Sequence, residues 1–97
     1  IINLSSGMGQ LIDMESGSSA YRISKASLNA ITKILSNELS EWKIKVNSIC
    51  PGWVKTDMGG QNATLTVQES VNEIIKFALD TNFPNGKFLR HGQIIPW

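Results

Sequence analysis

Short apolar runs alternate along this chain with longer stretches in which apolar residues recur every three or four positions. Residues 1–5 form an apolar run that ends in small polar residues, which predicts a buried strand followed by a turn. Residues 19–39 carry the helical repeat and predict a long central helix, through Ile23, Ala26, Ala30, Ile31, Ile34 and Leu35. The serines within positions 16–19 are candidates to cap its first turn.

The second half of the chain repeats this alternation. Residues 44–50 are rich in β-branched side chains and stop at a Pro-Gly pair, so they predict a second strand. Thr66 and Glu69 have the spacing of a capping box, which predicts the start of another helix. Its apolar residues lie on one face that we expect to turn toward a core: Val67, Val71, Ile74, Ile75, Ala78 and Leu79. Residues 87–89 predict a short third strand.

The order strand, helix, strand, helix, strand predicts an α/β fold with a parallel sheet and right-handed crossovers. In such folds ligands bind beyond the carboxyl ends of the strands. That rule selects Ser5 and Ser6 after the first strand and residues 51–56 after the second. The start of the central helix, which carries Tyr21, lies on the connection between them. We therefore expect these three segments to meet at one crevice.

Tyr21 and Lys25 are four residues apart, so on a helix they share one face with the ammonium near the phenol. A tyrosine phenol ordinarily keeps its proton until about pH 10, and a neighbouring positive charge favours its release. This pair is suited to exchanging a proton with a substrate. Two ordinary helix residues would show the same spacing, so the pair needs support from other motifs.

Composition and charge narrow the range of functions. The 97 residues are 41% apolar and 18% charged, which is typical of one small globular domain and not of a membrane-spanning or disordered chain. A net charge of +1 with scattered basic residues gives no stripe for nucleic acid. Cys50 stands alone and no apolar leader precedes the domain, which favours a cytoplasmic protein. His91 has no neighbouring ligands, so no metal site is predicted.

Three segments resemble, in the same order, motifs of the short-chain dehydrogenase/reductases: residues 3–9 (NLSSGMG), 21–26 (YRISKA) and 46–56 (VNSICPGWVKT). The resemblance implies that residues 1–97 form the C-terminal catalytic half of a single Rossmann-like domain, with a doubly wound parallel sheet. The N-terminal dinucleotide-binding half would be absent. Consistent with this, the Gly7-Met8-Gly9 run has Ile12 where a dinucleotide fingerprint needs its third glycine.

The end of the chain favours one subgroup of that family. Residues 86–88 and 92–97 are similar to the ends of NADPH-dependent carbonyl reductases. The resemblance therefore implies an oxidoreductase that reduces ketones or aldehydes by hydride transfer, with NADP(H) favoured over NAD(H) as the cofactor. The substrate would be a small carbonyl compound or the corresponding alcohol.

The resemblance also assigns roles. Ser6, rather than Ser5, matches the serine that holds the substrate carbonyl oxygen. Tyr21 would donate the proton, and Lys25 would assist it and bind the nicotinamide ribose, so both also contact the cofactor. The segment that lines the nicotinamide would include Pro51, Gly52, Val54 and Thr56.

The sequence also indicates partners, a mobile segment and two alternative functions. We expect the missing N-terminal half as a partner, and homo-oligomers through the central helix are possible. Residues 57–65 are expected to form a mobile lid because they contain Gly59-Gly60 and no apolar period. Two other functions share some features: a sugar-nucleotide epimerase or dehydratase, which also uses Tyr-x-x-x-Lys, and a non-catalytic remnant or interaction module.

Overall fold

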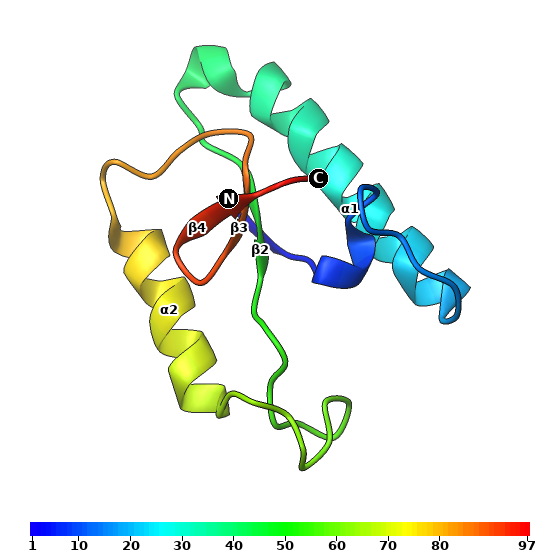
Figure 1. Cartoon of the computed structure of the whole chain (residues 1–97). Coiled ribbons are helices and arrows are strands. Elements are labelled where there is room, and N and C mark those ends of the chain that lie inside the picture. The colour runs from blue at the N-terminus through cyan, green and yellow to red at the C-terminus, as the bar shows by residue number, and fades with distance from the viewer.

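The apolar runs and the helical repeats form a four-stranded sheet with a long helix on each side (Figure 1). In this computed structural model, which describes all 97 residues, the strands are β1 (Ile2–Leu4), β2 (Asn47–Cys50), β3 (Phe88–Arg90) and β4 (Gln93–Ile95), in that order across the sheet. The first three are parallel, and β4 runs antiparallel to β3. The predicted α/β order of strands and helices is confirmed.

The two long helices are α1 (Ser19–Glu38) and α2 (Val67–Leu79), and short 3-10 helices, η1 (Gly7–Gly9) and η2 (Ser40–Trp42), follow β1 and α1. Successive side chains of a strand point to opposite faces of a sheet. On β2, the Ser48 hydroxyl hydrogen-bonds the Thr32 hydroxyl of α1 at 2.8 Å. The next residue, Ile49, packs in the core cluster on the side of α2. The two helices therefore cover opposite faces of β2.

The predicted central helix is confirmed, and the buried face of α1 is polar. Its buried residues are Asn29, Thr32 and Ser36, whereas Ile23, Ile31 and Ile34 are exposed. Short side chains allow the helix to lie close to the sheet, and hydrogen bonds of Thr32, Ser36 and the Asn29 Nδ2 offset part of the cost of burial, while the Asn29 Oδ1 is buried without a partner. Asn3 of β1, for example, donates to the Thr32 hydroxyl oxygen at 2.8 Å.

The prediction for α2 is right at its start and wrong for most of its apolar face. Thr66 and Glu69 form the predicted capping box, with Thr66 N and Glu69 N each bonded to the other residue's side chain. Only Ile74 among the predicted residues packs against the core of Ile49, Phe83 and Leu89, together with Phe77. The others are exposed: Val67, Val71, Ile75, Ala78 and Leu79. No other helix or strand of these 97 residues covers this face of α2.

Strand positions differ from the sequence prediction at several points, and β3 is shifted by one residue, from 87–89 to Phe88–Arg90. β2 begins at Asn47 and not at residue 44, because Lys43 has a left-handed conformation and the chain is exposed until Val46. β1, expected as a buried strand, lies at the edge of the sheet formed by these 97 residues, with Leu4 51% exposed. β4 was not predicted at all, since three residues after a Gly turn give too short a pattern.

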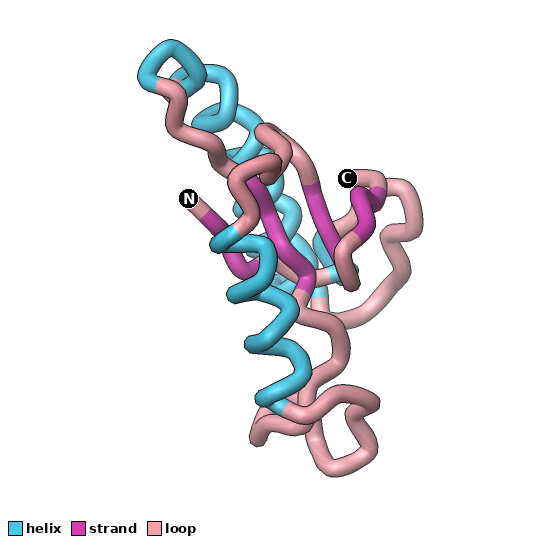
Figure 2. The backbone as a smooth tube through the Cα atoms, turned by 90° about the vertical axis from the view of Figure 1, so that its left-hand side faces the viewer, coloured by secondary structure: helices cyan, strands magenta, loops and turns pink.

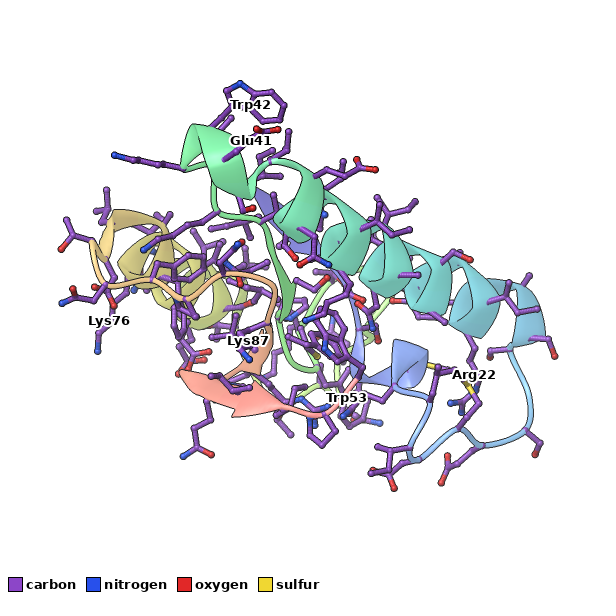
Figure 3. All side chains as sticks on the ribbon, turned by 90° about the horizontal axis from the view of Figure 1, so that it is seen from above. Arg22, Glu41, Trp42, Trp53, Lys76 and Lys87 are labelled. Carbon is purple, nitrogen blue, oxygen red and sulfur yellow. The ribbon has the colours of Figure 1, made fainter.

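The start of α1 has no side-chain cap, contrary to the prediction. The capping position is Ser18, which adopts left-handed backbone angles (φ 50°, ψ 39°) that do not place its hydroxyl over the first turn. Arg22 stabilises the segment instead: its Nε donates to the Gly17 carbonyl at 2.9 Å and its guanidinium lies 3.5 Å from Glu15. Figure 3 shows Arg22 beside the loop that precedes the helix.

The connection from β2 to α2 extends beyond one end of the sheet (Figure 2). At the opposite end of the molecule, Glu41 and Trp42 project from η2, away from the sheet (Figure 3). Neither long helix has the length and hydropathy that a membrane span requires.

Candidate functional site

A cavity of about 1100 Å³ opens at the carboxyl ends of the three parallel strands. Of the residues selected from the sequence, six line it: Ser6, Tyr21, Pro51, Gly52, Val54 and Thr56. They come from the turn after β1, the first turn of α1 and the segment after β2. The predicted meeting of three segments at one crevice is confirmed by this arrangement. Lys25 is not among the lining residues, but its ammonium lies beside the ring of Tyr21.

Tyr21 and Lys25 share a face of α1, as the helical spacing requires. The Lys25 ammonium nitrogen lies 5.6 Å from the centre of the Tyr21 ring, within the range of a cation–π interaction. It also donates a hydrogen bond of 2.9 Å to the backbone carbonyl of Leu4, the last residue of β1. Lys25 thus ties the start of α1 to the carboxyl end of β1, so the tyrosine is held beside the strand end.

The two adjacent serines have different environments. Ser5 is 3% exposed, and its hydroxyl points to the backbone carbonyl of Lys25 at 3.4 Å. Ser6 is half-buried and lines the cavity. Its hydroxyl oxygen accepts the Met8 backbone N–H at 3.1 Å, capping η1. Because an oxygen lone pair takes that bond, the hydroxyl hydrogen of Ser6 remains able to donate to a ligand.

The segment after β2 is supported from α2 and from the β3–β4 turn. The Ser70 hydroxyl of α2 donates to the Pro51 carbonyl at 2.9 Å. Gly52 has φ of +81°, and a Cβ there would lie 2.6 Å from Leu65 and 3.0 Å from the His91 ring. Only glycine fits both the backbone angle and the space. This packing determines where Val54 and Thr56 enter the cavity wall.

The far end of this segment is tied to its own loop. Val54 forms a parallel bridge with Leu65, and the Thr56 hydroxyl oxygen accepts the Gly59 N–H at 3.0 Å. The Trp53 indole donates to the Gly59 carbonyl at 2.8 Å, and the ring itself is 53% exposed beside the cavity. The base of residues 57–65 is therefore held by hydrogen bonds, while its tip at Met58 is 84% exposed.

Sequence reasoning missed several charged residues of the cavity wall. Arg22 lines it and pairs with Glu15, and His91 lines it and lies 2.9 Å from Glu73 of α2. Arg90, the last residue of β3, lines it without a carboxylate partner. The rule that ligands gather at carboxyl ends of parallel strands applies equally to β3 and would have selected Arg90.

Comparison with known proteins identifies relatives of this chain. Residues 1–80 match the family model described as "Enoyl-(Acyl carrier protein) reductase". Carbonyl reductase [NADPH] 1 of Mus musculus is 36% identical over 86 residues, which cover 81% of this chain and 31% of that protein. (+)-Neomenthol dehydrogenase of Arabidopsis thaliana is 40% identical over 78 residues, covering 78% of this chain and 26% of that protein.

Solved structures extend the likeness to the whole chain. Carbonyl reductase Sniffer of D. melanogaster superposes with a TM-score of 0.93 and 42% identity, over 100% of this chain and 40% of that one. The NADPH-bound carbonyl reductase from chicken fatty liver gives a TM-score of 0.88 and 37% identity, over 100% of this chain and 42% of that one. The chain thus spans about a third of the length of the curated relatives and about two fifths of these structures.

Proposed function

Since the chain belongs to the short-chain dehydrogenase/reductase family, where it corresponds to a C-terminal part, we propose that it is the catalytic half of an NADPH-dependent carbonyl reductase. The reaction is reduction of a ketone or aldehyde to an alcohol, with Tyr21 as the proton donor. The observation that carries this proposal is the convergence of Ser6 and Tyr21 on one cavity, with Lys25 against the tyrosine ring.

The cavity fits the nicotinamide end of a dinucleotide. Its wall combines hydroxyl groups of Ser6, Tyr21 and Thr56 with the backbone of residues 51–54 and with apolar side chains of α2. Hydroxyls and backbone groups suit an amide and a ribose, and apolar side chains suit a flat ring. For the adenosine end the chain offers no G-x-G-x-x-G sequence, so that end would need the other half of the fold. Pro51, Gly52, Val54 and Thr56 are the residues proposed to hold the nicotinamide.

When bound, the cofactor would supply a hydride to the carbonyl carbon of the substrate. Negative charge then grows on the carbonyl oxygen. The Ser6 hydroxyl, whose hydrogen is free, donates a hydrogen bond to that oxygen and orients it. Tyr21 transfers its phenolic proton to the same oxygen, which completes the alcohol. General acid catalysis of this kind contributes about 10² to 10⁴-fold in rate.

Lys25 supports the proton transfer through its charge. When the Tyr21 phenol gives up its proton, the ammonium beside the ring stabilises the negative charge that remains. An ammonium has three N–H donors, and the Leu4 carbonyl takes one of them. The remaining donors are available to bind the nicotinamide ribose. Lys25 is therefore assigned to both the tyrosine and the cofactor.

The choice of a reductase over a sugar-nucleotide epimerase or dehydratase rests on the relatives. The mouse and chicken proteins carry NADPH in their names, and the Arabidopsis protein is a dehydrogenase. The apolar part of the cavity wall also suits a carbonyl compound better than a charged nucleotide sugar: Met8, Trp53, Met58, Val71 and Ile74. These residues support an apolar ketone or aldehyde as the substrate class.

The exposed apolar surfaces support the proposal of a partner. β1 is at the sheet edge, and its free side exposes backbone donors and acceptors that another strand would pair. The outer face of α1 exposes Ile23, Ile31 and Ile34. We expect the first half of the fold to add strands beside β1, and α1 to offer a surface for a second copy. An interaction module without catalysis would need the same surfaces but not the hydroxyls in the cavity.

The direct experiment measures NADPH consumption by the assembled enzyme, residues 1–97 together with the first half of the fold. With apolar ketones and aldehydes, we expect one alcohol formed for each NADPH oxidised. Uridine diphosphate sugars serve as the matched comparison and should remain unchanged. Conversion of the nucleotide sugars without net NADPH oxidation would favour the epimerase alternative. Cofactor binding without any turnover would favour the non-catalytic remnant.

A further inference from the structure

Arg90 lies against the backbone of the turn that presents Ser6. It is the last residue of β3 and is in register with Cys50 of β2. A Cβ placed on Gly7 would lie 2.5 Å from a terminal guanidinium nitrogen of Arg90 and 3.3 Å from its Cζ. The guanidinium therefore occupies the space that a side chain at position 7 would take. Gly7 follows Ser6 directly and begins η1.

A hydrogen bond joins Arg90 to the other end of the same turn. The same terminal nitrogen donates to Gln10 Oε1 at 2.7 Å, and Gln10 is only 9% exposed. The Gln10 backbone N–H donates to the Gly7 carbonyl at 3.0 Å, and its side-chain Nε2 donates to the Pro96 carbonyl at 2.9 Å. The guanidinium thus contacts η1 at its first residue and is bonded to the residue that follows it.

The neighbouring strand adds a second support. Cys50 Sγ accepts the Gly7 backbone N–H at 3.2 Å. The turn is therefore held at two strand ends: by the Cys50 thiol at the end of β2 and by the Arg90 guanidinium at the end of β3. Since the hydroxyl oxygen of Ser6 accepts the Met8 N–H, the orientation of the turn sets the orientation of that hydroxyl.

No ion pair accounts for this arginine. Its Nε is buried without a hydrogen-bond partner, and the two ion pairs of the chain involve Arg22 and His91 instead. A partly buried charge without a counter-charge costs folding free energy, so a contribution to stability does not explain why an arginine occupies position 90. We propose that Arg90 is a positioning residue that holds η1 so that the Ser6 hydroxyl faces the substrate carbonyl. This inference rests on the proposed reductase function.

The first test separates turnover from binding in the assembled enzyme. Arg90→Ala is expected to lower kcat for carbonyl reduction by about tenfold or more, because small misplacements of a reacting group are costly. The KM for NADPH should stay within about twofold, since Arg90 is not assigned to the cofactor. An unchanged kcat would overturn the proposal.

A conservative pair tests the hydrogen bond itself. Gln10→Glu keeps an oxygen for Arg90 and loses the donor to Pro96, whereas Gln10→Met loses both. If the link to Arg90 matters, Gln10→Glu retains most of the activity and Gln10→Met behaves like Arg90→Ala. Equal losses in the two variants would place the effect at Pro96 and contradict the proposal.

A double-mutant cycle tests the contact with Gly7. Gly7→Ala should displace the flexible guanidinium and lower kcat in the wild-type background, but cost almost nothing further in the Arg90→Ala background. Gly9→Ala is the matched control: its Cβ would lie 2.7 Å from the Lys25 backbone, so its cost should be the same in both backgrounds. Additive losses for Gly7→Ala and Arg90→Ala would overturn the proposal.

Hydrogen exchange makes the result independent of activity. In Arg90→Ala, the Gly9 and Gln10 amides, which bond within this turn, should exchange at least about tenfold faster, while α2 amides stay unchanged. If the wild-type enzyme reduces no carbonyl compound, the reductase function fails but this measurement still decides whether Arg90 holds the turn. Unaltered exchange at Gly9 and Gln10 would refute the positioning role whatever the activity.

Discussion

Lys25 joins the start of α1 to the end of β1 through one hydrogen bond, 2.9 Å from its Nζ to the carbonyl oxygen of Leu4. The same ammonium lies beside the Tyr21 ring. One side chain therefore links the proposed proton donor to the strand end where the cavity opens. This relationship makes Lys25 a sensitive position in the proposed mechanism.

Lys25→Met is expected to damage both chemistry and cofactor binding. The change removes the charge beside Tyr21 and the donors proposed for the nicotinamide ribose. We expect kcat to fall by about 100-fold and the Kd for NADPH to rise by about tenfold, the size of a charge-assisted hydrogen bond. Lys33→Met, on the exposed side of the same helix, is the control and should change neither value. An unaltered Kd for NADPH in Lys25→Met would remove the ribose role.

The capping box of α2 predicts a dependence of stability on acid. Hydrogen bonds from the Thr66 backbone and hydroxyl hold the pKa of the Glu69 carboxyl below its ordinary value of 4.5. A carboxyl with a lowered pKa stabilises the folded state above that ordinary value, and the contribution is lost as the pH falls through the lower value of the folded state. Thermal unfolding should therefore show α2 weakening as the pH falls below about 4.5.

Substitution isolates that contribution. Glu69→Gln keeps the side-chain oxygen but cannot titrate, so the difference in Tm from wild type should be largest at neutral pH and shrink in acid. Glu41→Gln is the control, because Glu41 is exposed and has no hydrogen-bond partner among the side-chain bonds of this chain. A Tm difference for Glu69→Gln that is constant from neutral to acid pH would contradict the capping-box account.

Residues 57–65 are predicted to behave as a lid with a supported base and a mobile tip. The base is bonded to Trp53 and Lys55, whereas Met58 and Gly60 at the tip are exposed. Hydrogen exchange should be faster for Met58, Gln61 and Asn62, whose backbone N–H groups have no partner in the chain, than for α2, and should slow when NADPH is bound. Protection equal to that of α2, with and without the cofactor, would show that the segment is no lid.

Residues 1–97 by themselves are predicted to associate and to bind NADPH weakly. The unpaired edge of β1 and the exposed isoleucines of α1 favour association, and the adenosine end of the cofactor has no glycine-rich turn to bind. Sedimentation should therefore show oligomers. Ile31→Lys with Ile34→Lys should reduce them, whereas the control Met58→Lys, outside α1, should not. A stable monomer that binds NADPH at micromolar concentration would show that the chain needs no other half.

The position of the candidate site was predictable from sequence because it follows from topology. Parallel strands place their carboxyl ends together, so Ser6 and residues 51–56 had to meet near the connection that carries Tyr21. The capping box was also predictable, since Thr66 and Glu69 act on neighbouring backbone. Both cases depend on local spacing and on the order of elements, which the sequence displays directly.

The interior of the fold was less predictable. The buried face of α1 is identified by hydrogen bonds of Asn29 to η1 and of Thr32 to β2, and a search for apolar periodicity assigns such residues to solvent. The same search placed six apolar residues of α2 in a core and left out Phe77, whereas Ile74 and Phe77 are the residues of α2 that pack against the core cluster. The strand-end rule could have selected Arg90 for the cavity wall, but its contacts with Gln10 and Gly7 exist only in the folded chain and could not be predicted.

The most direct test of the account is the turnover of Tyr21→Phe in the assembled enzyme, measured with saturating NADPH and an apolar ketone. The substitution deletes the phenolic oxygen and keeps the ring beside Lys25, so cofactor binding should stay within about threefold of wild type while kcat falls by at least about 100-fold. A variant that reduces the ketone within a few-fold of the wild-type rate would show that Tyr21 is not the proton donor.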